Sequence, residues 1–255
     1  MNIPVIYEDD WLLAVDKPSG LLVIPTPKKE TRTLTSILNE DLAERSKTYR
    51  LHPCHRLDRE TSGLIIYAKG KSIQEKMMLE FKERKVKKVY IAFLQGHLFK
   101  EQGEIKKPIE GKNALTKYKV IQRKKDFTVV EIMPWTGRTN QIRIHFKDIG
   151  HPLVGETKFA FRRDFALKAK RLCLHAEALE FLHPITKKSV KLSTGLPEDL
   201  KKFLGLAGVP LLRKEVCMVK VLIIYYSRTG NTKKMAEIIS EGVKKEGCEL
   251  SLIHI

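Results

Sequence analysis

The stretch HRLDRETSGLIIYAK at residues 55–69 joins a charged turn to an apolar strand. Its first half places the carboxylate of Asp58 between Arg56 and Arg59, and its second half has the apolar character of a buried strand. Loops at the ends of strands commonly display reactive groups. Because opposite charge favours the anion, we expect Asp58 to stay ionised and nucleophilic. The same pattern is also typical of an arginine–aspartate pair that only holds a turn.

The segments around this stretch predict one α+β domain over residues 1–210, with a mixed, mostly antiparallel sheet flanked by helices. Two or three strands are expected in residues 5–25 and helices in residues 33–47 and 72–85, the second beginning with a capping box of Ser72 and Glu75. Further strands are expected at 87–94, 115–122, 127–133, 172–182 and 189–193, with a short helix after Pro197.

Residues 141–146, QIRIHF, alternate apolar and polar side chains. Strict alternation is typical of a strand with one buried face, so we expect a strand here. Arg143 would then lie on its polar face.

The sequence changes character near residue 210. We interpret residues 211–217 as a linker and residues 218–255 as an extra βα unit, which begins with a near-continuous apolar run typical of a buried parallel strand. A turn at 227–232 and an amphipathic helix ending at Gly247 are expected to follow.

The charge of the chain indicates a polyanionic partner. Lysine and arginine number 48 against 30 acidic residues, which gives a net charge of +18. Such a basic chain attracts nucleic acid through counterion release, although solubility alone would also explain the charge. The clusters at 82–88, 123–125 and 162–170 are candidate phosphate contacts, or simply solvated faces.

Membrane, secretory and metal-binding classes are disfavoured. No apolar run approaches the roughly 18 residues of a membrane span, and the N-terminus lacks the features of a secretory signal. The four cysteines show no CxxC pair, which fits a reducing compartment and no zinc site. His55, His145 and His175 lack ligand-like spacing and are expected to be hydrogen-bonding framework residues. We therefore expect a cytoplasmic protein without metal, and a monomer.

Seven segments resemble, in order, motifs of the RluA-like family of pseudouridine synthases, which isomerise uridine within RNA. Residues 55–65 resemble the HRLDxxTSGLL signature. The others are DKPSGL at 16–21, KVYIA at 88–92, TGRTNQIRIH at 136–145, GHPLVG at 150–155, RLCLHA at 171–176 and FLHP at 181–184. The resemblance covers about residues 5–194 and implies an isomerase that acts on rRNA or tRNA without a cofactor.

The resemblance also implies roles for four residues. Asp58 matches the catalytic aspartate, which acts as nucleophile or as the base that starts glycosidic cleavage. Arg56 would fill the space that the flipped uridine vacates. Tyr90 would stack on the uracil, and Arg143 would pair with the catalytic carboxylate. A core tyrosine and a structural ion pair are the alternatives for Tyr90 and Arg143.

Two positions depart from the family pattern. Asn140 stands where GRTHQIR has histidine, and Glu156 stands where GDxxYG has aspartate. Both keep hydrogen-bonding capacity, so they put the substrate in doubt more than the activity.

Residues 220–242 resemble the opening of flavodoxin-like proteins, where the loop after the first strand binds the phosphate of FMN. The flavin-binding loops that would follow are absent, so we interpret residues 218–255 as a truncated fragment without function.

Three other functions remain open. A non-catalytic RNA-binding or ribosome-assembly factor could keep the same fold, although Arg56, Asp58, Tyr90 and Arg143 are all present. A flavin-dependent redox protein would need the missing loops, and a sequence-specific DNA binder would need a recognition helix that the sequence lacks.

Overall fold

The computed structural model describes residues 3–27, 30–160, 167, 169–205, 220–225 and 249–254. The chain divides into two compact units, Met1–Gly205 and Leu206–Ile255. No helix in the described ranges is long and apolar enough to cross a membrane.

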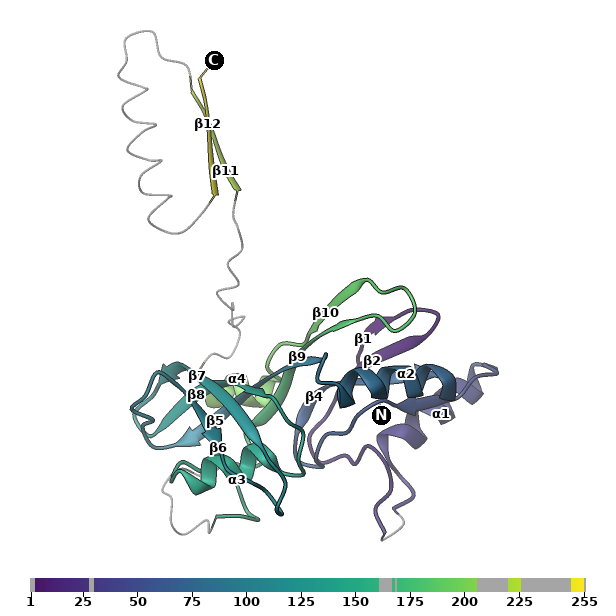
Figure 1. Cartoon of the computed structure of the whole chain (residues 1–255), viewed down its shortest axis with the longest axis horizontal. Helices are drawn as coiled ribbons and strands as arrows, with labels where there is room; N and C mark the ends of the chain where they lie inside the picture. The colour runs from purple at the N-terminus through teal and green to yellow at the C-terminus, as the bar shows by residue number, and fades with distance from the viewer. Residues whose placement is uncertain are drawn as a thin grey trace. The chain divides into compact units, whose positions relative to one another are not determined.

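The first unit is built on one ten-stranded sheet (Figure 1). Its main path runs β1 (Val5–Glu8), β2 (Leu12–Lys17), β4 (Ser62–Lys69), β9 (Leu174–Leu182), β5 (Lys87–Gln95), β8 (Phe127–Pro134), β7 (Leu115–Arg123) and β6 (Gln102–Lys106). Strands β3 (Leu51–Pro53) and β10 (Ser189–Ser193) pair with β4 and β9. Among the described strands of this sheet, β4 and β9 form the parallel pair and the other pairs are antiparallel. The expected mixed, mostly antiparallel sheet is therefore confirmed.

Strands β4 and β9 meet only at the start of β4. Ser62 pairs with His175 and Gly63 with Ala176. Gly63 has a φ of 116°, and a Cβ there would lie 2.2 Å from the carbonyl oxygen of Ala176. Glycine is therefore required for the two strands to approach. On the other side of β9, Ala176 pairs with Tyr90 of β5. Ala176 therefore joins the two halves of the sheet.

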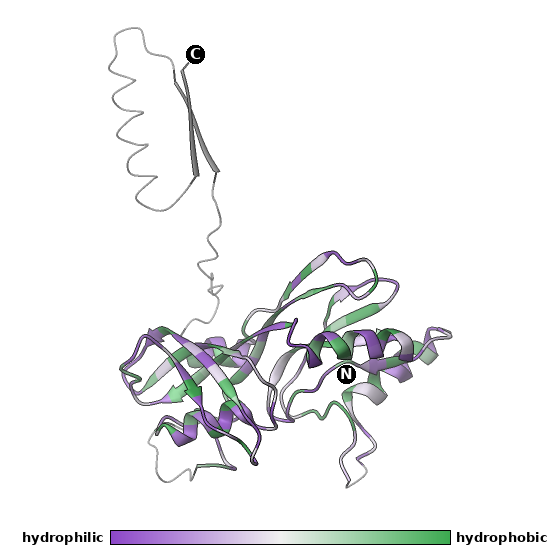
Figure 2. Ribbon diagram, viewed as in Figure 1, coloured by the Kyte–Doolittle hydropathy of each residue, from purple (hydrophilic) through white to green (hydrophobic). Residues whose placement is uncertain are grey.

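Helices α1 (Leu34–Glu44) and α2 (Lys71–Lys82) cover opposite faces of β4. Ile65 and Tyr67 pack with α1, while Leu64 and Ile66 pack with α2. Burial on both faces explains why this strand is apolar between its two end residues. Figure 2 shows the matching pattern on the helices, whose ribbons carry both hydrophobic and hydrophilic stretches.

Both predicted helices are confirmed, but the capping box is found on α1 and not on α2, where the sequence predicts it. Helix α1 has one, formed by Thr33 and Ser36. Helix α2 begins after Gly70 without a side-chain cap, so the capping box expected from Ser72 and Glu75 is wrong.

Residues 141–146 are not a strand, as their alternation predicts, but part of helix α3 (Gln141–Asp148). The turn before the helix sets its start: Asn140 has a φ of 53°, and Gln141 N donates to Arg138 O. Polar and apolar side chains of α3 are both buried, because Gln141 and His145 find hydrogen-bond partners inside the domain. Alternation then carries no information about which face is exposed.

The other expected strands are confirmed within a few residues, while β3 and β6 lie where no strand is expected. The short helix after Pro197 is α4 (Glu198–Phe203). It places Phe203 against Phe93 of β5 and Phe127 of β8.

In the second unit, β11 (Lys220–Tyr225) pairs in parallel with β12 (Glu249–His254). The parallel pairing expected for the first strand of this unit is therefore present, whereas its expected burial lies outside what the structure describes. The expected linker at 211–217, the turn at 227–232 and the helix that follows lie outside the described residues.

Candidate active site

A cavity of about 490 Å³ brings together the four residues singled out in the sequence. Arg56 and Asp58 come from the loop before β4, Tyr90 from β5 and Arg143 from α3. A smaller hollow of about 200 Å³ also has Arg56, Asp58 and Arg143 in its wall. Asp58 therefore borders both spaces.

The backbone of the Asp58 loop is held by the turn that follows β2. The ammonium of Lys17, which is fully buried, donates to the carbonyl oxygens of Arg59 at 3.1 Å, Leu21 at 2.7 Å and Pro18 at 2.9 Å. Three acceptors for three protons satisfy the buried charge.

Two further bonds join the same turn to the loop. Ser19 Oγ donates to Glu60 O at 2.6 Å, and Gly20 N donates to Arg59 O at 2.8 Å. The backbone on the C-terminal side of Asp58 is therefore fixed. The motif at 16–21 indicated the turn, but no local signal in the sequence indicated that Lys17 reaches across to Arg59.

The environment of Asp58 opposes its charge. Burial raises the pKa of this carboxyl above its ordinary value, Glu60 adds to the rise, and Arg143 and Arg56 act against it. Desolvation thus opposes the ionised form of Asp58 that the sequence predicts, while the positive charges of Arg143 and Arg56 favour it.

Tyr90 is partly buried and shares the cavity wall with Asp58. Its strand pairs it with Ile132 on one side and Ala176 on the other, and its ring packs against the core clusters of both halves of the sheet. Burial, with a contribution from the Asp58 charge, raises the pKa of its hydroxyl. The hydroxyl is therefore held protonated next to the carboxylate.

Arg143 is buried and makes its ion pairs with residues other than Asp58. Its Nε and one terminal nitrogen donate to the two carboxylate oxygens of Glu156 at 2.8 and 2.7 Å. Its other terminal nitrogen donates to Glu60 at 3.2 Å and to Asn140 at 3.1 Å. Within the described ranges no ion pair joins Arg143 to Asp58, although the resemblance implies one. The two charges still attract each other at longer range, and this attraction opposes the rise in the pKa of Asp58.

Both departures from the family pattern, Asn140 and Glu156, thus contact the same guanidinium. Glu156 Oε1 also accepts the backbone N–H groups of Thr157 at 3.0 Å and Lys158 at 2.8 Å. Burial opposes the charge of Glu156, but the Arg143 and backbone hydrogen bonds lower its pKa overall.

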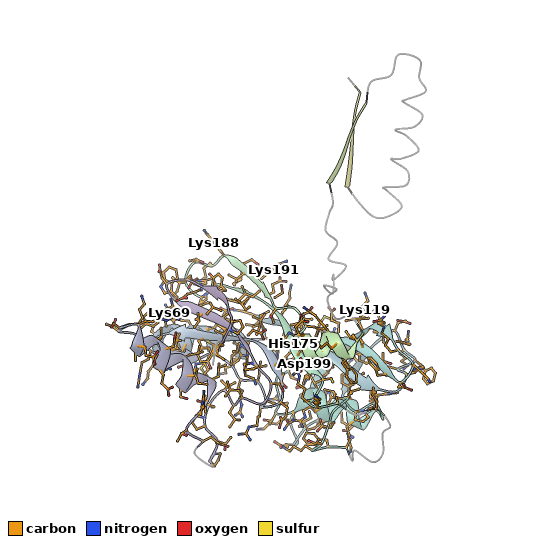
Figure 3. The ribbon with its side chains drawn as sticks, turned by 180° about the vertical axis from the view of Figure 1, so that it is seen from behind. Lys69, Lys119, His175, Lys188, Lys191 and Asp199 are labelled. Atoms are coloured by element: carbon orange, nitrogen blue, oxygen red, sulfur yellow. The ribbon has the colours of Figure 1, made fainter. Side chains whose placement is uncertain are left out.

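The three histidines are framework residues, as expected. His55 accepts from Ile66 N at 3.1 Å, and burial lowers its pKa to about 3. His145 bonds Thr116 Oγ1 and the carbonyl oxygen of Lys107. His175 bonds Ser62 Oγ at 2.9 Å at the β4–β9 junction (Figure 3).

Basic side chains line the cavity on the side of α2 and β5. Lys82, Arg84 and Lys88 belong to the first expected phosphate-contact cluster, and all three lie in the cavity wall. Burial and the nearby Arg84 lower the pKa of Lys88 to about 8. The cluster at 162–170 lies mostly outside the described residues. Lys188 and Lys191, on the β9–β10 hairpin, are basic residues away from this wall (Figure 3).

Comparison with known proteins shows the family to which the chain belongs. The sequence pattern of the family described as RNA pseudouridylate synthase matches residues 11–148. The chain is 35% identical over 221 residues to the uncharacterized RNA pseudouridine synthase YlyB of Bacillus subtilis, covering 80% of this chain and 72% of the relative. It is 36% identical over 209 residues to the dual-specificity RNA pseudouridine synthase RluA of Pasteurella multocida, covering 75% of this chain and 92% of the relative.

A solved structure shows the same fold. The human RNA pseudouridylate synthase domain containing 4 superposes with a TM-score of 0.66 at 23% identity, covering 80% of this chain and 92% of that protein.

Proposed function

This chain belongs to the RluA-like family of RNA pseudouridine synthases, isomerases that act on RNA, and we propose that Asp58 is its catalytic group. The observation that carries the proposal is the cavity itself. It joins Asp58 to Arg56, Tyr90 and Arg143, which come from three separate parts of the chain.

The reaction keeps every heavy atom of the uridine, and its overall composition, while it moves one bond. The bond between N1 of the uracil and C1′ of the ribose breaks, and a bond between C5 and C1′ forms. The proton on C5 leaves, and N1 gains a proton. Asp58 would start this sequence as nucleophile or base, and its half-buried carboxylate is more reactive than a fully hydrated one.

Neighbouring residues would bind and orient the uridine. A base within a stack cannot reach a carboxylate in a cavity, so the uridine must flip out. Arg56 is exposed and lies next to the cavity, where it can occupy the vacated space. Tyr90 lines the same cavity as Asp58, where its ring would stack on the uracil. Arg143, held by Glu156, supplies a fixed positive charge close to Asp58.

We extend the proposal to the context of the reaction. The substrate is a looped or structured site in rRNA or tRNA, and the enzyme works in the cytoplasm as a monomer without metal or organic cofactor. Residues 218–255 take no part in the reaction. A variant that ends at residue 210 should keep its activity, and loss of activity with folding retained would contradict this.

Tritium release tests the central claim. RNA labelled with tritium at C5 of uracil must lose the label when C5 joins the ribose. Bulk tRNA and rRNA are tested separately with the full chain and with Asp58→Ala. Release by the native chain alone supports Asp58 chemistry and identifies the RNA class. Release by both proteins would remove Asp58 from the mechanism, and release by neither would favour a non-catalytic RNA-binding factor.

A further inference from the structure

Trp135 is a large aromatic side chain left half exposed beside the cavity. It follows β8, its side chain is 52% exposed, and it lies in the wall of the cavity that contains Asp58. Burying a tryptophan releases a large apolar area from water, so an exposed one at a functional cavity indicates a surface that a ligand covers.

The backbone beneath Trp135 is rigid. Trp135 N donates to Leu115 O at 3.0 Å, and Leu115 N donates to Thr136 Oγ1 at 3.0 Å. Thr136 Oγ1 in turn donates to Gln141 at 2.6 Å, and Pro134 is buried. The ring is thus presented from a fixed position, which lowers the entropic cost of binding to it.

The surroundings of Trp135 are cationic. Lys82, Arg84 and Lys88 share the cavity wall with it, and none of these three forms an ion pair with a described carboxylate. An apolar protein partner would leave these charges desolvated and unpaired. A nucleotide offers both a flat base for the ring and a phosphate for the cations.

We propose that Trp135 forms a stacking subsite for a base that flanks the target uridine in the RNA substrate, with Lys88 and Arg84 holding the adjoining phosphate. This rests on the proposed function. The target uracil itself belongs with Tyr90, which is partly buried and feels the charge of Asp58, whereas Trp135 is 52% exposed. The substrate is therefore a strand that is unpaired for at least one nucleotide next to the target.

Tryptophan fluorescence measures this stacking directly. The chain has two tryptophans, and Trp11 packs against His183 with ring centroids 5.5 Å apart. A Trp11→Phe background in the full chain leaves Trp135 as the reporter. The probes are a ten-nucleotide oligouridylate and an abasic oligomer with the same number of phosphates. Stacking quenches the reporter with the first probe and not with the second.

Affinity is measured by a method that needs no tryptophan. Trp135→Ala should weaken oligouridylate binding about 10-fold and leave abasic binding unchanged, because stacking contributes only where a base is present. Trp135→Phe should recover most of the loss. Phe99→Ala is the matched control, since Phe99 is 90% exposed and lies outside the cavity wall, and it should change neither affinity.

Equal loss for both probes, no loss in Trp135→Ala, or no selective quenching would overturn the subsite. These outcomes are distinct from failure of the proposed function, because binding is read without turnover. If oligouridylate quenches the reporter selectively but no tritium is released, the stacking subsite is supported and the isomerase activity is contradicted. In turnover, Trp135→Ala should raise KM more than it lowers kcat.

Discussion

Arg143 and Glu156 form a buried ion pair in which both carboxylate oxygens accept from the guanidinium, at 2.8 and 2.7 Å. The side chains are 3% and 1% exposed. Such a two-point contact fixes both the position and the plane of the guanidinium. Glu156, which lies after α3, therefore positions the Arg143 guanidinium whose charge acts on Asp58.

Glu156→Gln should destabilise the fold by about 3 kcal/mol, because it leaves the buried guanidinium of Arg143 without its main counter-charge. Urea unfolding measures the change. Glu104→Gln is the control, since Glu104 pairs with Lys106 and Lys117 at the surface, and no measurable loss is expected. Equal stability of Glu156→Gln and the native chain would contradict the pair's structural importance.

The same pair should make stability depend on pH in the acid range. The pKa of Glu156 is lowered by folding, so the stabilisation is complete above the ordinary glutamate pKa and is lost as pH falls through the lower folded value. Unfolding free energy measured against pH should fall in acid for the native chain. In Glu156→Gln this part of the pH dependence should be missing.

Asp58→Asn should abolish tritium release without lowering stability. Burial raises the pKa of Asp58, which means that folding disfavours its ionised form, and a neutral amide removes that cost. For the native enzyme, the raised pKa moves the acid limb of activity to higher pH than an ordinary aspartate would give. Retained tritium release by Asp58→Asn would refute the catalytic role.

Lys17→Met should lower kcat more than it raises KM, because the three carbonyl groups that hold the Asp58 loop lose their donor. Burial lowers the pKa of Lys17 to about 8, so native activity should decline as pH rises through that value. Lys88 has a pKa of about 8 as well. Lys88→Met is therefore the control, and the decline of kcat at high pH should persist in this variant. In Lys17→Arg, whose side chain stays charged, the same decline should shift to higher pH.

Gly63→Ala should unfold or strongly destabilise the domain, by about 3 kcal/mol or more. Its Cβ would lie 2.2 Å from Ala176 O at the junction of β4 and β9. Gly70 has the same φ of 116° but nothing within 4 Å, so Gly70→Ala isolates the backbone strain. The difference between the two unfolding free energies measures the clash, and equal losses would show that strain alone matters.

Local patterns in the sequence were sufficient for much of the fold. Strands such as β7 and β10 follow from alternation, and β4 follows from its apolar run, because these patterns reflect burial of one or both faces. Motif resemblance singled out Arg56, Asp58, Tyr90 and Arg143, and the fold places all four at one cavity.

Tertiary structure alone decided the rest. Residues 141–146 alternate like a strand, yet they form α3 because Gln141, Arg143 and His145 find buried partners. The partner of Arg143, the desolvation of Asp58 and the reach of Lys17 to Arg59 depend on segments far apart in the chain. A sequence states which groups are present and what they favour locally, whereas burial and long-range contacts determine which of those preferences is satisfied.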